Sequence, residues 1–262
     1  MLESIKEKIH QVKKYQFLFS ELVKRDFKKK YKRTVLGMFW SVLSPLMQLA
    51  VMAVVFSRFF GSDMEHYIIY LFSGNLIFSF YKDATIGGMH ALMQNADIIK
   101  NINVPKYLFM ISKEVSACIN FGLTLVIYFL FVAIDGISFS WSFLLLIYPV
   151  VCLVLFNIGV GFILSALFVI FKDVQYLYDI FTQLLMYVSA IFYTTSVYPE
   201  KIQLIFFANP VYSYIAYFRS IVLEGTIPPA WHHLLCFGYA VIMLITGMAI
   251  YKKYNYKFMY YI

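Results

Sequence analysis

The sequence predicts an all-α integral membrane protein. Hydrophobic residues make up 61% of the 262 residues, and charged residues make up only 14%. Several apolar runs approach the roughly 20 residues that a helix needs to cross a bilayer. This composition excludes a soluble enzyme, and the length leaves room for about six spans with short loops but not for an attached soluble domain. We therefore expect one membrane domain over 1–262, with an arm at 1–34, a six-span bundle at 36–251 and a tail at 252–262.

Six apolar stretches between charged residues are the predicted transmembrane helices. They are 36–60, 67–88, 107–133, 142–170, 174–197 and 233–251. Lysine and arginine gather in the N-terminal arm, around Lys100 and Lys106, at Lys172 and in the tail, and these segments alternate with loops that carry few basic residues. The positive-inside rule therefore places both termini in the cytoplasm, which requires an even number of crossings.

The segment 199–223 is apolar enough to suggest a seventh span, but Asn209 and Pro210 divide it. Each half is too short to cross a bilayer, and proline ends or kinks a helix because it lacks an N–H donor. We expect a re-entrant helical hairpin that dips in from the outer face between spans five and six, beside a translocation path. Two amphipathic helices lying flat on the outer leaflet are the alternative.

The N-terminal arm carries an apolar stripe at helical spacing, which predicts an amphipathic helix in the membrane interface. The stripe consists of Tyr15, Leu18, Phe19, Leu22, Val23 and Phe27. The neighbouring cations suit anionic headgroups, each being worth about 1 kcal/mol near the surface. A phosphate-binding cluster is one interpretation, and a generic topology anchor is the other.

The longest predicted cytoplasmic connection is 89–107. Ile98 and Ile99 lie between Asp97 and Lys100, which predicts a short helix that ends near Pro105. A short helix below the membrane suits the docking of a partner, and an ordered connector is the alternative.

Charged residues also lie near the predicted span ends: Lys82, Asp83, Lys113, Glu114 and Asp179. Such groups normally face the bundle interior and pair with one another. We expect snorkelling or cross-helix pairs, such as Lys82 with Glu114 or Asp83 with Lys113, rather than a proton relay. Gly159, Gly161 and Ser165 permit a close approach of the fourth span to a neighbour.

Motifs for catalysis are absent from the sequence. It contains no G-x-x-x-x-G-K-[ST] phosphate loop, no H-E-x-x-H and no G-x-S-x-G. Cys118, Cys152 and Cys236 lie in apolar runs without metal-ligand spacing. We expect neither an enzyme nor a metal site, and no nucleic acid as a partner.

Three segments resemble type-2 ABC exporter permeases that move polysaccharides across bacterial inner membranes. They are LVKRDFKKKYKRTVLGMFWSVLSPLMQL at 22–49, NADIIKNINVPKYLF at 95–109 and FFANPVYSYIAYFRSIVLEG at 206–225. In that family they resemble the N-terminal segment that leads into the first span, the cytoplasmic coupling segment and the outer re-entrant hairpin. The resemblance runs through nearly the whole chain.

This resemblance implies a half-transporter in the bacterial inner membrane. Two permease copies pair with two copies of a separate ATPase, which binds ATP and Mg, and this chain holds no cofactor. The substrates of the family are undecaprenyl-diphosphate-linked O-antigen or capsule-like glycans, phospholipid-linked capsules and lipid-linked teichoic acids. An exporter of drugs or small lipids, and a polyprenyl-phosphate-dependent transferase, are the alternatives; the short outer loops and the missing acidic motif count against them.

The resemblance also suggests roles for individual residues. The residues near the lipid phosphates would be Arg25, Lys28, Lys30 and Arg33. Those that meet the ATPase would be Asp97, Ile98, Ile99, Lys100, Asn101 and Pro105. Those that border the glycan would be Tyr187, Phe192, Tyr193, Tyr198, Phe207, Tyr212, Tyr214 and Arg219, although membrane-belt and packing roles remain open for these rings.

Overall fold

The computed structural model describes residues 15–28, 36–60 and 64–261, and every regular element within these ranges is a helix. The all-α prediction is therefore confirmed. The six longest are α2 (Trp40–Phe60), α3 (Tyr67–His90), α5 (Tyr107–Ile134), α6 (Ile147–Ile170), α7 (Val174–Val188) and α10 (Ala230–Tyr254). Shorter elements are η1 (Gly37–Phe39), η2 (Met93–Asn95), α4 (Ala96–Asn101), η3 (Trp141–Leu146), η4 (Thr195–Val197), α8 (Glu200–Phe206), α9 (Pro210–Val222) and α11 (Phe258–Tyr261).

Four helical segments of the described ranges are long and apolar enough to cross a membrane: Trp40–Ser57, Tyr107–Ile134, Trp141–Ile170 and Ala230–Tyr254. The second and fifth predicted spans, which correspond to α3 and α7, are not among these four. Helix α3 is long, but it carries Lys82 and Asp83 and is buried over most of its length. Helix α7 has 15 residues, fewer than a bilayer crossing usually needs.

The prediction that the fifth span runs over 174–197 is wrong at its C-terminal end. Helix α7 ends at Val188, and Ala190 adopts a left-handed conformation with φ of 48°. The carbonyl oxygens of Ala190 and Ile191 point to the guanidinium group of Arg219 and accept hydrogen bonds from it at 2.9 and 3.2 Å. A tertiary contact, which no helical periodicity reveals, therefore ends this helix.

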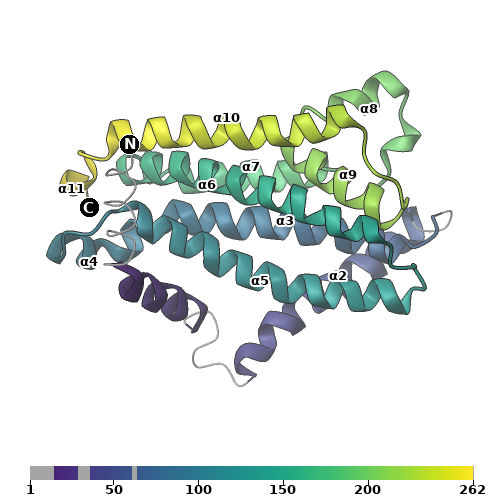
Figure 1. Ribbon diagram of the computed structural model, residues 1–262, viewed down its shortest axis with the longest axis horizontal. Helices are drawn as coiled ribbons and strands as arrows, with labels where there is room; N and C mark the ends of the chain where they lie inside the picture. Colours follow the sequence, from purple (N-terminus) through teal and green to yellow (C-terminus); the bar gives the residue numbers. More distant parts are fainter. Residues whose placement is uncertain (1–14, 29–35, 61–63, 262) are drawn as a thin grey trace.

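Helix α3 forms the centre of the bundle and lies between α5 and α6, while α10 covers the other side of α6 (Figure 1). One apolar cluster surrounds α3, and its largest fully buried side chains include Phe72, Tyr128, Tyr214 and Phe218. A second cluster lies at the end of the bundle that carries α4 and α11, and it includes Leu22, Ile99, Phe109, Phe162 and Phe258.

Glycine permits the close packing of α6 against α10. A Cβ atom at Gly159 would overlap the backbone carbonyl group of Met243, and one at Gly247 would overlap the carbonyl group of Gly159. Helices in a membrane gain little from the hydrophobic effect against each other, so close backbone contact is a main source of their association. The expectation that Gly159 permits a close helix approach is confirmed.

The break predicted at Asn209 and Pro210 is confirmed as well. Helix α8 ends at Phe206, and α9 begins at Pro210, with the Asn209 side chain accepting hydrogen bonds from the N–H groups of Val211 and Tyr212. Asparagine before a proline at the first helical position is a common helix start. Helix α8 lies at the opposite end of the bundle from α4 and α11 (Figure 1).

Candidate functional site

A groove of about 730 Å³ lies between α2, α3 and α5, with Met186 of α7 at its side. Helix α2 runs obliquely to α3 and α5 (Figure 1) and buries few of its own side chains, so it leaves this space open. The groove is lined by Trp40, Ser41, Ser44, Pro45, Gln48, Met52, Asn75, Leu76, Phe78, Ser79, Lys82, Asp83, Asn120, Thr124 and Met186.

Nine of the fifteen residues that line the groove are polar or charged. Hydroxyl and amide groups come from α2, α3 and α5, and Lys82 and Asp83 add a charge of each sign. Polar side chains inside a membrane helix are costly unless they face protein or a water-filled cavity, so they usually mark a path or a binding site. The groove can donate hydrogen bonds to hydroxyl-rich or anionic groups and can accept them from hydroxyl-rich groups.

None of the candidate site residues identified in the sequence lines this groove, but the sequence contains a signal for it. Its polar residues recur at helical spacing: Ser41, Ser44 and Gln48 on α2, Asn75, Ser79 and Lys82 on α3, and Asn120 and Thr124 on α5. Residues three or four apart share one face of a helix. A search for polar stripes within the apolar spans would have found them.

Lys82 lies in the groove, whereas Glu114 is buried beside Asn157, and the described structure contains no ion pair between Lys82 and Glu114. The ion pair between Lys82 and Glu114 that the sequence suggested is therefore wrong. Lys113 instead forms an ion pair with Asp26 at 3.1 Å and donates a hydrogen bond to Gln94 at 2.9 Å. Asp26 belongs to the N-terminal helix at 15–28, and Gln94 belongs to η2, the short helix after α3.

The predicted amphipathic helix forms over residues 15–28, and its apolar side packs on the bundle through Leu22, with Tyr15 and Leu18 beside it. Arg25 donates hydrogen bonds to Asp26 at 2.9 Å and to Asn95 at 2.8 Å. Lys28 is exposed, while Lys30 and Arg33 lie outside the described residues. Arg25, expected near lipid phosphates, thus already contacts protein groups.

The predicted coupling segment forms α4 and the loop up to Pro105, as expected from the sequence. Ile99 is buried in the second cluster and Ile98 packs against it, whereas Asp97, Lys100 and Asn101 are exposed. The segment therefore presents a polar outer face at the end of the bundle.

Two further hydrogen bonds fix the chain around this segment. Tyr15 donates to the carbonyl of Asn103 at 3.3 Å, and Lys106 donates to that of Asn255 at 2.9 Å. Burial lowers the pKa of Lys106 from its ordinary value. The N-terminal helix and the C-terminal end of the chain therefore both hold α4 and the loop after it in place.

The predicted glycan-bordering rings do not share one environment. Tyr187 and Tyr198 are exposed, and Tyr193 and Phe207 are half-buried. Phe192, Tyr212 and Tyr214 are buried, and the hydroxyl of Tyr214 donates to the carbonyl of Cys236 at 2.9 Å. The described structure brings Tyr193, Tyr198 and Phe207 together with Phe206 and Tyr212 in one set of ring contacts.

Arg219 is also buried, so it does not border an open path in this structure. Its guanidinium group donates hydrogen bonds to Ser73 and to the carbonyls of Tyr70, Ala190 and Ile191, and it lies 3.4 Å from the ring centre of Tyr70. These contacts join α9 to α3 and to the turn after α7. The sequence placed Arg219 along the glycan path and could not reveal this burial, because the acceptors belong to distant segments of the chain.

We predict that Asp26→Asn weakens the contact between the N-terminal helix and the bundle. The carboxylate of Asp26 is 5% exposed and the ammonium group of Lys113 is 14% exposed. Breaking one partner of a buried pair leaves the other charge uncompensated, at a cost of about 3 kcal/mol. Proteolysis of the purified protein should cut near residues 15–28 faster in this variant. Glu21→Gln breaks the exposed pair with Lys24 on the same helix and should change nothing; equal cleavage of the two variants would contradict the assignment.

The ABC-2 type transporter family matches residues 17–223, a range that contains the groove, α4 and the turn between α8 and α9. An O-antigen export system permease protein RfbA of Klebsiella pneumoniae is 27% identical over 247 residues, which cover 92% of this chain and 95% of that protein. A second Klebsiella pneumoniae protein of the same name is 26% identical over equal shares. One from Myxococcus xanthus is 23% identical over 254 residues, covering 95% of this chain and 97% of that protein.

Proposed function

This chain belongs to the ABC-2 type transporter family, and from that premise we propose that it is the permease subunit of an ATP-driven exporter of lipid-linked polysaccharide. The three relatives named as O-antigen export permeases align with it over more than nine-tenths of each chain. The cargo would be an O-antigen or a similar polymer on undecaprenyl diphosphate, moved from the cytoplasmic leaflet across the bacterial inner membrane.

The chain is a multi-pass membrane protein, and we propose six crossings in one domain over 1–262, with α3 and α7 as the second and fifth. Helix α3 needs no apolar surface all round because most of it is buried against its neighbours, while Lys82 and Asp83 face the groove. The helix at 15–28 would lie in the cytoplasmic interface, and α8 and α9 would form the re-entrant hairpin on the outer side. The basic residues near α4 and α11 support a cytoplasmic location for that end and for both termini.

A permease of this family works with an ABC ATPase, and we propose two ATPase copies and a second copy of this chain. The exposed polar face of α4, with Asp97, Lys100 and Asn101, would meet the ATPase, while Ile98, Ile99 and Pro105 would keep the segment on the bundle. ATP and Mg would bind to the ATPase. The apolar exposed side of α7, which includes Leu177, Ile180 and Leu184, would pack against the second permease copy or lipid.

The observation that carries the proposal is the polar groove. Sugar hydroxyl groups exchange hydrogen bonds with serine, threonine, asparagine and glutamine side chains, and the groove presents these over three membrane helices. Lys28, Lys30 and Arg33 remain the proposed ligands of the lipid phosphates. Tyr187 and Tyr198, which are exposed, remain the rings best placed to contact the glycan.

We predict that the double variant Gln48→Leu/Asn120→Leu exports polymer about thirtyfold more slowly, since two hydrogen bonds worth about 1 kcal/mol each are lost along the path. Polymer on the cell surface and lipid-linked polymer in the cytoplasmic leaflet would both be measured in a host whose own permease is deleted. Surface polymer should fall and the cytoplasmic pool should rise, while the amount of permease stays the same.

Met47→Leu is the matched control, because Met47 is next to Gln48, is 56% exposed and does not line the groove. It should export normally. Normal surface display in the double variant would exclude the groove as part of the path. If deletion of the whole chain changed drug resistance but not polymer display, export of a small apolar compound would replace the present proposal.

A further inference from the structure

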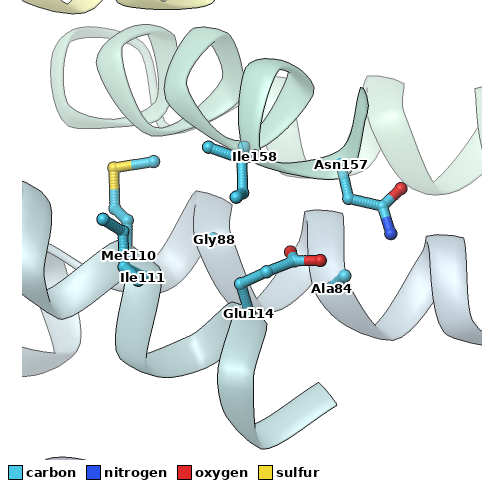
Figure 2. Close-up of a pocket in the computed structure, with 8 residues that line it drawn as sticks. Ala84, Gly88, Met110, Ile111, Glu114, Asn157 and Ile158 are labelled. Carbon is cyan, nitrogen blue, oxygen red and sulfur yellow. The ribbon is translucent and has the colours of Figure 1, made fainter. Parts of the chain in front are cut away.

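A second cavity lies inside the bundle where α3, α5 and α6 meet (Figure 2). The centre of a water molecule can lie anywhere within about 10 Å³ of this cavity. That is about the space that one bound water molecule requires. The groove described above does not include it. Its lining residues are Ala84, Gly88, Met110, Ile111, Glu114, Asn157, Ile158 and Gly161.

Two polar side chains in this apolar lining lack hydrogen-bond partners. Glu114 is 4% exposed and Asn157 is fully buried. Oε1 of Glu114 and both Oδ1 and Nδ2 of Asn157 make no hydrogen bond of normal geometry with any protein group, although the two side chains lie near enough to each other to interact. Figure 2 shows the two side chains reaching from α5 and α6 into the same space. Buried polar groups are nearly always satisfied by protein or by ordered water, so three unpartnered atoms around one small cavity point to a bound ligand.

We propose that this cavity binds one water molecule, which bridges the carboxyl group of Glu114 to the carboxamide of Asn157. A water molecule can make up to four hydrogen bonds, both as donor and as acceptor, so it suits an amide and a carboxyl group whichever way each is oriented. A divalent metal ion does not suit the cavity. Hard cations take about six or more oxygen ligands, whereas Glu114 and Asn157 supply the only side-chain oxygens in its lining.

The bridge lies beside a close crossing of α3 and α6, where a Cβ atom at Gly88 would lie 3.1 Å from the Cα atom of Gly161. Because Glu114 belongs to α5 and Asn157 to α6, the water molecule would set how α5 sits against α6. Helix α5 also carries Asn120 and Thr124 of the groove, but the bridge does not depend on what passes through that groove.

Thermal unfolding of the full-length protein in lipid nanodiscs tests the coupling of the two side chains. Glu114→Leu and Asn157→Leu should each lower the midpoint by roughly 2–10 °C, because each leaves the other polar group without its bridge. The double variant should lose no more than the worse single variant. Additive losses would show that the side chains act independently and would overturn the bridge.

A second experiment tests the ligand itself. Density maps of the unmodified protein and of Glu114→Gln are needed at a resolution that shows ordered water. Glutamine keeps the shape and can still bind water, so its unfolding midpoint should match that of the unmodified protein. Both maps should show one peak within hydrogen-bond distance of residues 114 and 157. A direct hydrogen bond between the two side chains would show that the cavity holds no ligand. An unfolding midpoint that falls when choline replaces Na⁺ would show that the cavity binds a cation. Either result would overturn the proposal.

Discussion

Replacing Arg219 with leucine is expected to prevent the protein from accumulating in folded form. The change removes the hydrogen bonds from the guanidinium group to Ser73 Oγ and to the carbonyls of Tyr70, Ala190 and Ile191 inside the bundle. The carbonyls of Tyr70 and Ala190 each keep a hydroxyl donor. Hydrogen bonds to a charged group are worth about 1.5–3 kcal/mol each, so the total loss is roughly 4 kcal/mol or more. That is a large part of the 5–15 kcal/mol by which folded proteins are typically stable.

Size-exclusion chromatography of a fluorescent fusion in detergent would measure this effect as loss of the monodisperse peak. Arg219→Lys should recover only part of the peak, because an ammonium group cannot reach acceptors that a planar guanidinium contacts on several sides. Lys201→Leu removes an exposed cation on α8 and should change stability by less than about 0.5 kcal/mol. A full peak for Arg219→Leu would show that these hydrogen bonds contribute little to stability.

The second large effect is expected from Gly159→Ala. The added methyl group would collide with the backbone of α10 at Met243 and would lie 2.6 Å from the amide nitrogen of Leu244. A backbone cannot move aside as a flexible side chain can, so α6 and α10 must separate along their contact. We expect a loss of about 3 kcal/mol, at the upper end of the range for overpacked sites.

The fraction that remains monodisperse after a heating series would report this loss. Gly238→Ala is the matched control on α10, because a Cβ atom there meets nothing within 4 Å. It should stabilise the protein by about 0.5–1 kcal/mol, since alanine loses less conformational freedom than glycine on forming a helix. If both alanine variants were equally stable, close packing of α6 on α10 would not be required.

Helix α4 and the groove differ in whether local sequence patterns could predict them. The short helix α4 was predicted because it depends on residues a few positions apart. The burial of Ile99, which the sequence placed among the residues that meet the ATPase, was not predicted. The groove depends on how α2 is oriented against α3 and α5, and neighbouring residues do not encode that angle. For the same reason, rings that the sequence placed along one path divide into exposed ones, such as Tyr187, and packed ones, such as Tyr214.

The sequence by itself determined the class of protein, the helical elements, the break at Asn209 and Pro210 and the family resemblance. These properties depend on composition, on helical periodicity and on short motifs, all of which are local. Only the tertiary structure decided that α7 ends at Val188, that Arg219 binds backbone carbonyls in the interior and that Lys113 pairs with Asp26. In each case the deciding partner is distant along the chain, and a buried polar group is stable only where folding brings that partner within hydrogen-bond distance.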